Sequence, residues 1–144
     1  MTRARRSLGR EGEERAARHL EARGYQIVAR NVRAARVEID LIARDGRQIV
    51  FVEVKTRRSG PRDGFGGHGF AAEAVDDRKQ ARLRRGAAAW LAEHPEAGRG
   101  RWGVRFDVIT CVRDERGGVL APQNDDTAHP ADARWSIEHW KAAF

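Results

Sequence analysis

Two carboxylates and a lysine occupy neighbouring segments whose residue pattern predicts β-strands. Asp40 falls in Val37–Ala43, and Glu53 and Lys55 fall in Gln48–Thr56. Glu53 and Lys55 are two residues apart, so in a strand they share a face at a distance of roughly 7 Å. Carboxylate oxygens are ligands of hard divalent cations such as Mg²⁺, which also bind phosphate. The ammonium group could orient or deprotonate a water molecule, or stabilise charge on a phosphate.

The register of the hairpin between these strands decides whether the charged groups meet. Asp45-Gly46 is a strong hairpin signal, and a two-residue turn there pairs Asp40 with Phe51 and Glu38 with Glu53. One face then carries only core residues: Val37, Ile39, Leu41, Val50, Val52 and Val54. The other face gathers its charges at the end far from the turn: Glu38, Asp40, Glu53 and Lys55. A three-residue loop would put carboxylates among the core valines, which the cost of burial disfavours.

Facing acids destabilise a hairpin unless something compensates them, and a bound divalent cation would do so. An ordinary strand with a polar outer face is the alternative interpretation of the same residues. Glu38 is a possible supporting acid of the site. Glu13 lies in the first turn of a predicted helix, where an acid is often present only because it complements the helix dipole.

The charge balance favours a polyanionic partner. The chain has 28 Lys and Arg against 21 Asp and Glu, for a net charge of +7, and arginine suits forked contacts to phosphate. Residues 55–85 hold nine basic and four acidic residues and follow the carboxylates directly. The basic residues predicted to bind nucleic acid on either side of the site are Arg57, Arg58, Lys79 and Arg82. A GC-rich coding sequence or a solvated helix face would also explain this charge.

The rest of the pattern predicts one α/β domain over residues 1–144, with a core at about 8–113 and a C-terminal extension at 114–144. Helices are expected at 9–24, from Asp76 to His94, and at Trp135–Phe144. Strands are expected at Tyr25–Asn31, Val37–Ala43, Gln48–Thr56 and Trp102–Arg113, with a loop at 57–70 in which Phe65 could stack on a base. The order α-β-β-β-α-β indicates a single mixed sheet flanked by helices.

Other features restrict the cellular setting and the chemistry. The single cysteine, Cys111, excludes an intramolecular disulfide and is expected to be a buried apolar residue. No segment approaches the roughly 20 apolar residues that span a bilayer, so we expect a cytoplasmic protein without a membrane partner. The histidines lack zinc-like spacing. Asp107 is expected to be structural, bonded to an arginine or to the backbone.

Several short stretches, taken in their order along the chain, resemble the motifs of the PD-(D/E)XK nuclease superfamily. They resemble more closely those of the uncharacterised bacterial YraN-like family, which is similar to archaeal Holliday-junction resolvases. The resemblance covers about residues 8–113. The stretches that carry it are Gly9–Glu13, Gly24-Tyr25, Asn31, Glu38–Ile42, Phe51–Arg57, Val75, Lys79, Arg105–Val108 and Ala143-Phe144.

The resemblance implies a restriction-endonuclease-like core and a role for each motif residue. Asp40 and Glu53 would ligate Mg²⁺ or Mn²⁺ with the backbone carbonyl of Val54, Lys55 would be the catalytic lysine, and Glu13 would be the supporting acid. A homodimer would be in keeping with resolvase-like proteins. One departure is Val37, because the family usually has glycine before the Glu-Ile-Asp run, and that glycine would permit a close approach of backbone or ligand.

The resulting hypothesis is a metal-dependent endonuclease that hydrolyses phosphodiester bonds, with branched DNA as a candidate substrate. The alternative is a non-catalytic nucleic-acid-binding module that keeps the nuclease fold, and a third class is an adaptor whose basic helix meets an acidic protein. The sequence leaves open DNA against RNA, the number of metal ions and the oligomeric state.

Overall fold

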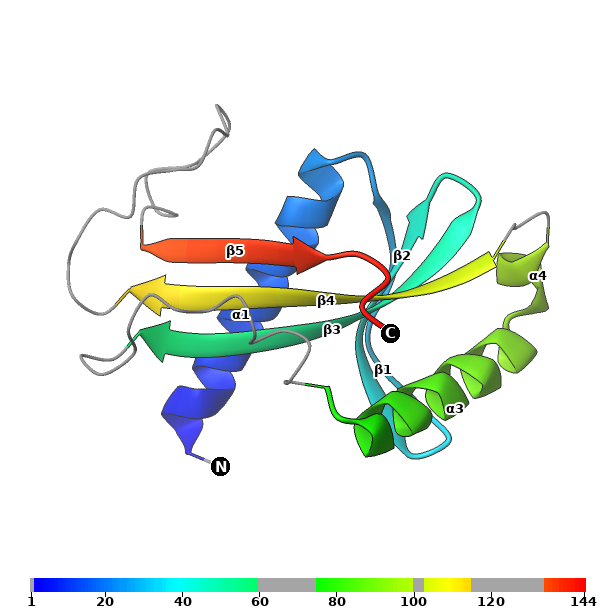
Figure 1. The fold of residues 1–144 in the computed structure, drawn as a ribbon, viewed down its shortest axis with the longest axis horizontal. Helices are drawn as coiled ribbons and strands as arrows, with labels where there is room; N and C mark the ends of the chain where they lie inside the picture. The colour runs from blue at the N-terminus through cyan, green and yellow to red at the C-terminus, as the bar shows by residue number, and fades with distance from the viewer. Residues whose placement is uncertain (1, 60–74, 100–102, 115–133) are drawn as a thin grey trace.

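A five-stranded mixed sheet in the order β1-β2-β3-β4-β5 forms the centre of the protein (Figure 1). The computed structural model describes residues 2–59, 75–99, 103–114 and 134–144. Its elements are α1 (Arg3–Ala22), β1 (Gln26–Ala34), β2 (Val37–Asp45), β3 (Gln48–Ser59), α3 (Asp77–Glu93), α4 (Pro95–Gly98), β4 (Gly103–Asp114) and β5 (Trp135–Trp140). Strands β3 and β4 are parallel, and the other neighbours are antiparallel. This confirms the predicted α/β class with one mixed sheet flanked by helices.

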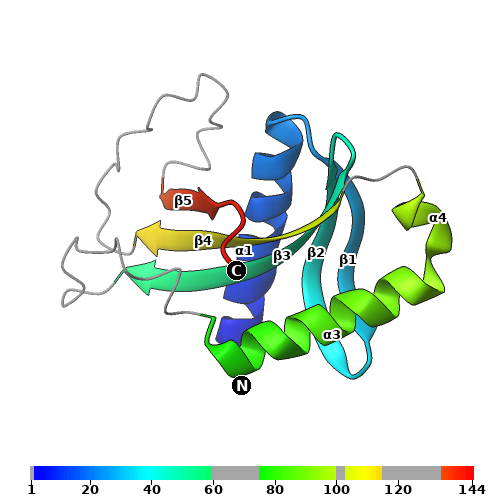
Figure 2. The ribbon, with the colours of Figure 1, turned by 45° about the vertical axis from the view of Figure 1, so that its right-hand side comes forward.

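The two long helices cover opposite faces of the sheet, as Figure 2 shows. On the α1 side, buried Ala16, Ala17 and Leu20 pack with a cluster of strand residues that includes Leu41, Val50, Val52, Ile109 and Cys111. On the α3 side, Ala87 and Trp90 pack with Ile42, Ile49 and Phe51. Trp90 and Cys111 are therefore core residues, as predicted. Among the described helices, none combines the length and the apolar character needed to cross a membrane.

Helix α3 begins where its capping residue predicts. The Asp76 side chain accepts a hydrogen bond from the Lys79 backbone N–H at 2.8 Å, which satisfies one of the free amides of the first turn. Helix α1 is longer than predicted, because it begins at Arg3 after the capping residue Thr2. The predicted loop at 57–70 starts too early, because β3 continues to Ser59. The rest of that loop, including Phe65, lies outside the described residues.

The prediction of a terminal helix at Trp135–Phe144 is wrong, because Trp135–Trp140 forms strand β5. This strand pairs antiparallel with β4, with Cys111 opposite Ile137. Trp135 and Ile137 are two residues apart and both pack against the cluster on the α1 side. Residues two apart lie on the same face of a strand but on different faces of a helix, so this spacing fits a strand.

The predicted register of β2 and β3 is also wrong, by two residues. Asp45 pairs with Gln48, so the two turn residues are Gly46 and Arg47. Gly46 has a φ of 56°, and glycine adopts this left-handed conformation without steric cost. Continuing the observed register one residue past Leu41 and Val52 sets Asp40 level with Glu53, where the prediction had set Glu38.

Strand β2 changes its packing partners along its length, so the predicted single apolar face is divided between two cores. Leu41 packs on the α1 side, whereas Ile39 belongs to the cluster with Trp90. Val37, only 3% exposed, packs with Leu83 of α3. A Cβ added to Gly86 of α3 would lie 2.9 Å from the Val37 Cβ, so the absent side chain of Gly86 makes room for Val37.

A second close approach fixes α1 on the sheet. A Cβ at Gly12 would lie 2.0 Å from the Thr56 Oγ1 of β3, so the helix can rest here only on a residue without a side chain. Gly12 directly precedes Glu13. The contact therefore sets how far the Glu13 carboxylate stands from β3.

We expect Gly12→Ala to destabilise the protein by about 1–3 kcal/mol, because an overpacked contact must be relieved by moving α1. Chemical denaturation measures the change. Thr56→Ala removes the atoms that approach most closely, so the Gly12→Ala/Thr56→Ala double variant should recover part of the loss. Gly9→Ala is the matched control, since a Cβ at Gly9 meets no atom within 4 Å among the described residues. A loss in Gly9→Ala equal to that in Gly12→Ala would contradict this account.

Candidate carboxylate and lysine site

Asp40 stands where β2 and β3 separate. The paired residues of the two strands end at Leu41 and Val52, and the Val54 backbone N–H donates instead to the Asp40 Oδ2 at 2.8 Å. The side chain of Asp40 thus takes the place of a backbone partner for β3. Its carboxylate is held in the fork between the strands, beside Glu53.

Glu53 is the most buried acid of the group, with 7% of its surface exposed. Its Oε1 lies 3.4 Å from the Lys55 Nζ, and it accepts a short hydrogen bond from the Lys79 Nζ of α3. The structure therefore brings Glu53 and Lys55 together as predicted. It also adds Lys79, which the sequence analysis assigned to phosphate binding rather than to the carboxylates.

The protonation equilibria show how closely these charges are held. Burial, and then the charge of Glu53, raise the pKa of Asp40 to about 8, against a lowering effect of its bond to Val54. Burial is the main cause that lowers the pKa of Lys55, followed by its neighbour Lys79. The pKa of Lys79 is raised, because its hydrogen bond and charge interaction with Glu53 outweigh the effect of burial.

Glu13 joins the group from α1. Its pKa is raised, first by burial and then by the charges of Glu38 and Glu53. The predicted supporting acid thus lies within electrostatic range of Glu53, although it is far away in sequence. Glu38 is exposed and lies opposite Arg33 of β1. Its charge therefore acts on Glu13 from the exposed edge of the group.

Asn31 is a residue of this group to which the sequence analysis gave no role. Its side chain hydrogen-bonds Glu13. Arg30 pairs with Leu41 and Val32 with Ile39, so Asn31 lies level with Asp40. Its φ of 49° is left-handed, although β1 continues on both sides of it. A left-handed residue inside a strand redirects its side chain and often marks a functional position. The sequence feature that could have identified this position is an asparagine within a strand pattern, because asparagine tolerates the left-handed conformation.

The other predicted residues lie around this centre. Arg57 is half-buried and Arg58 exposed on β3, and Arg82 is exposed on α3. No group of three or more His, Cys, Asp and Glu side chains within the described residues has the arrangement of a metal-ligand set. A metal held here would take the two carboxylates Asp40 and Glu53 with oxygens of another kind, such as the Val54 carbonyl.

Asp107 has the structural role that was predicted for it. It is fully buried, accepts hydrogen bonds at 2.8 and 2.9 Å from Arg105, and lies 2.8 Å from the His139 Nε2. The Ala142 backbone N–H donates to it at 3.0 Å. Burial alone would raise the pKa of Asp107, but the bonds from His139 and Arg105 hold it below its usual range. These contacts fasten the end of the chain to β4.

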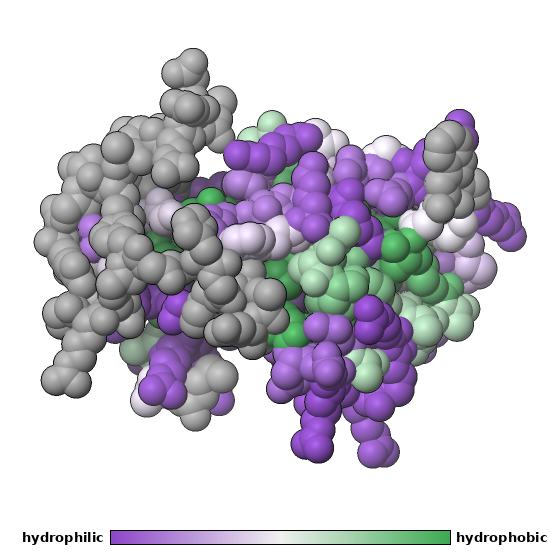
Figure 3. All heavy atoms as spheres, in the orientation of Figure 1, coloured by the Kyte–Doolittle hydropathy of each residue, from purple (hydrophilic) through white to green (hydrophobic). Residues whose placement is uncertain are grey.

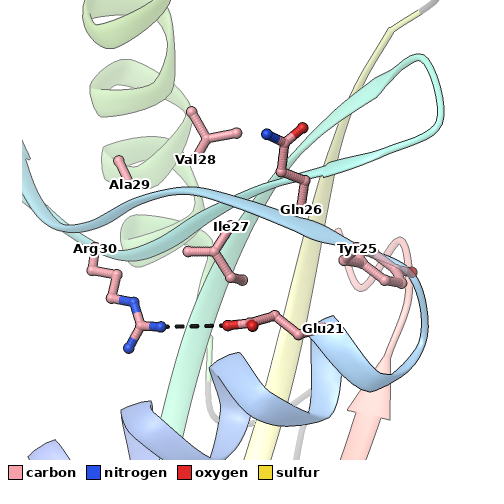
Figure 4. A pocket seen from close by; sticks show the side chains of 7 residues that line it. All are labelled: Glu21, Tyr25, Gln26, Ile27, Val28, Ala29 and Arg30. Atoms are coloured by element: carbon pink, nitrogen blue, oxygen red, sulfur yellow. Dashed lines mark hydrogen bonds and ion pairs between the residues drawn. The ribbon is translucent and has the colours of Figure 1, made fainter.

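A surface hollow of about 660 Å³ lies elsewhere, between β1 and the C-terminal half of α1 (Figure 4). Glu21, Tyr25 and residues 26–30 line it, and an ion pair between Arg30 and Glu21 crosses it. None of the site carboxylates lines this hollow. Its shape alone therefore gives no reason to prefer it to the charged cluster at the strand fork.

Comparison with known proteins identifies the family. The model of the uncharacterised protein family UPF0102 matches residues 12–111. The chain belongs to this family. A UPF0102 protein of Frankia casuarinae is 53% identical over 81% of this chain and 92% of its own length. One from Chlorobaculum tepidum is 46% identical over 95% of this chain and 91% of its own.

UPF0102 corresponds to the YraN-like family that the motifs resemble. The matched region contains Glu13, Asp40, Glu53, Lys55 and Lys79. The whole charged cluster at the strand fork thus lies within the part of the chain that defines membership of UPF0102.

We expect Asp40→Asn to remove a pH dependence of stability in metal-free buffer. Between its unfolded pKa near 3.8 and its folded pKa of about 8, Asp40 keeps a proton only in the folded state. The free energy of unfolding of the wild type should therefore fall as pH rises from 5 to 9, by on the order of 2 kcal/mol. Asparagine can still accept from Val54 and carries no charge. Denaturation at several pH values measures this, with exposed Glu138→Gln as control. A wild-type curve parallel to that of Asp40→Asn would contradict the assignment.

We expect Asn31→Gly to raise the pKa of Glu13 further, because the lost hydrogen bond favours the ionised carboxylate. Glycine keeps the left-handed backbone, so the change isolates the amide. Carboxyl titration by NMR measures the pKa. Ala35→Gly is the matched control, since Ala35 has a φ of 48°. An unchanged Glu13 pKa in Asn31→Gly would show that Asn31 does not act on this carboxylate.

Proposed function

We propose that this UPF0102 protein is a metal-dependent endonuclease that hydrolyses phosphodiester bonds, with branched DNA as its substrate class. The observation that carries the proposal is the position of Asp40 in the fork between β2 and β3. There Asp40 lies level with Glu53, which is two residues from Lys55 on the same face of β3. The order and spacing of these residues resemble the PD-(D/E)XK pattern. The mixed sheet between two helices is consistent with a restriction-endonuclease-like core.

The residues at the fork fit a hard divalent cation. A buried carboxylate such as Asp40, whose proton affinity is raised by burial and by a neighbouring carboxylate, also attracts a cation. The carboxylate and carbonyl oxygens of the fork are ligands that Mg²⁺ or Mn²⁺ accepts. Asp40, Glu53 and the Val54 carbonyl would hold it. When bound, such an ion polarises a phosphate oxygen and lowers the pKa of a coordinated water.

The chain's own groups would complete the chemistry. Because the pKa of Lys55 is lowered, a larger fraction of its amine is unprotonated near neutral pH than in an ordinary lysine. Its position beside Glu53 suits it to hold the attacking water. Lys79 would exchange its bond with Glu53 for a phosphate oxygen as the site is filled. Glu13, positioned by Gly12 and Asn31, would steady the water network from the side of α1.

One observation favours a second candidate, a non-catalytic nucleic-acid-binding module. Lys55 and Lys79 both contact the Glu53 carboxylate. Two ammonium groups can offset the acids without a metal ion, in which case the cluster would only stabilise the fork. Binding by such a module would be salt-sensitive but independent of divalent cations.

Cleavage of labelled flap, fork and four-way DNA with Mg²⁺ or Mn²⁺ separates the candidates. We expect the wild type to cut at least one substrate, and Lys55→Ala, Asp40→Asn and Glu53→Gln each to lower the rate by about 100-fold or more. Exposed Glu138→Gln is the control and should cut like the wild type. Binding without cleavage under every metal condition would establish the second candidate, and equal cleavage by Lys55→Ala would refute the lysine's role.

A further inference from the structure

The first turns of α1 carry an unusual concentration of positive charge. Arg3, Arg5, Arg6 and Arg10 are all exposed, and no acidic residue stands in the first turn. The N-terminus of a helix carries partial positive charge, which favours acids and disfavours cations there. These arginines therefore work against the stability of the helix that bears them, and their presence needs another cause.

The second half of α1 shows the opposite arrangement. There Arg15 lies 3.5 Å from Glu11, and Arg18 lies 3.5 Å from Glu14. By contrast, the side chains of Arg3, Arg6 and Arg10 form no ion pair with any described residue. The positive charge is thus compensated near the core and left open toward the N-terminus.

The open arginines are aligned with the site. Arg3, Arg6, Arg10 and Glu13 follow one another at intervals of three and four residues, so they lie along one flank of the helix. Arg10 is close enough to lower the pKa of Glu13, against the larger effect of burial. From Arg3 to Arg10 the helix rises about 10 Å, which corresponds to about three phosphates of one duplex strand.

Helix α3 approaches the same carboxylates from the other side. Its first turn brings Lys79 to Glu53, and its exposed residues Arg78, Arg82 and Arg85 lie at matching helical intervals. The N-terminal ends of α1 and α3 lie at the same end of the molecule in Figures 1 and 2. Hydrophilic side chains gather along the corresponding lower edge of the face in Figure 3.

We propose that Arg3, Arg6 and Arg10 form a phosphate-binding row that holds the backbone of a DNA strand and leads it to the carboxylates of the fork. This proposal rests on the nucleic-acid-binding part of the proposed function and states where one DNA strand would lie. The row on α3 would hold the backbone beyond the cluster. The DNA would then cross the cluster between the two helix ends.

Fluorescence anisotropy with a labelled 30-base-pair duplex and a four-way junction, in EDTA so that no cleavage occurs, tests the row. We expect the Arg3→Ala/Arg6→Ala/Arg10→Ala variant to bind at least tenfold more weakly at low salt. Its dependence of log Kd on log salt concentration should be shallower by about 2.7, the value for three lost phosphate contacts. The matched control, Arg23→Ala/Arg47→Ala/Arg99→Ala, removes equal charge at exposed positions outside the row and should keep most of the affinity and slope.

A single-residue comparison within the same helical turn sharpens the test. Arg5 and Arg6 are both exposed and equally near the helix terminus, but only Arg6 lies on the flank of Glu13. Arg6→Ala should therefore weaken binding more than Arg5→Ala. The triple variant should melt at the same or a higher temperature than the wild type, because cations have left the helix N-terminus.

The outcomes separate this inference from the proposed endonuclease. Equal losses of affinity in the row variant and the control, or a row variant that loses stability along with binding, would overturn the row. Loss of binding in the row variant from a wild type that cleaves no substrate would retain the row and reject the nuclease. Cleavage by the wild type with unchanged binding by the row variant would do the reverse.

Discussion

The hydrogen bond from the Val54 amide to Asp40 is the interaction on which the site depends. A strand that leaves its neighbour exposes backbone amides, and a buried amide must find another partner. Asp40 supplies that partner at 2.8 Å, so the sheet can open between β2 and β3 without an unsatisfied donor. An asparagine oxygen would serve the backbone equally well. The presence of an acid at this position, beside buried Glu53, is therefore the part that backbone pairing leaves unexplained.

The two lysines at the fork both contact Glu53, and neither forms an ion pair with Asp40 among the described contacts. Glu53 is held by Lys55 and Lys79, whereas Asp40 meets the charge of Glu53 and has a pKa of about 8. Glu13, whose pKa is raised first by burial and then by the charges of Glu38 and Glu53, adds to the same repulsion. A cluster selected only for stability would pair its acids more completely or replace them by apolar groups. The residual repulsion is the physical argument for a site that takes up a cation.

The sequence predicted the composition of this site better than its geometry. Alternation set Asp40, Glu53 and Lys55 on one face, and a slip of two residues leaves that alternation unchanged. The predicted register of β2 and β3 was wrong because the glycine of Asp45-Gly46 can occupy either position of a two-residue turn. A helix was predicted at Trp135–Phe144, where strand β5 forms, because a short apolar segment fits both periods. Lys79 and Asn31 reach the cluster only through tertiary packing, which no local pattern encodes.

Val37, where the resembling family usually has glycine, bears on whether the site is intact. Its side chain packs with Leu83 of α3, in a space that the absent Cβ of Gly86 leaves open. Asp40 and Ile39 follow it in β2 with their own contacts to Val54 and to the Trp90 cluster. The added methyl groups are thus accommodated by the helix, not by the fork. A valine compensated in this way changes the α3 interface and leaves the hydrogen bond between Val54 and Asp40 in place.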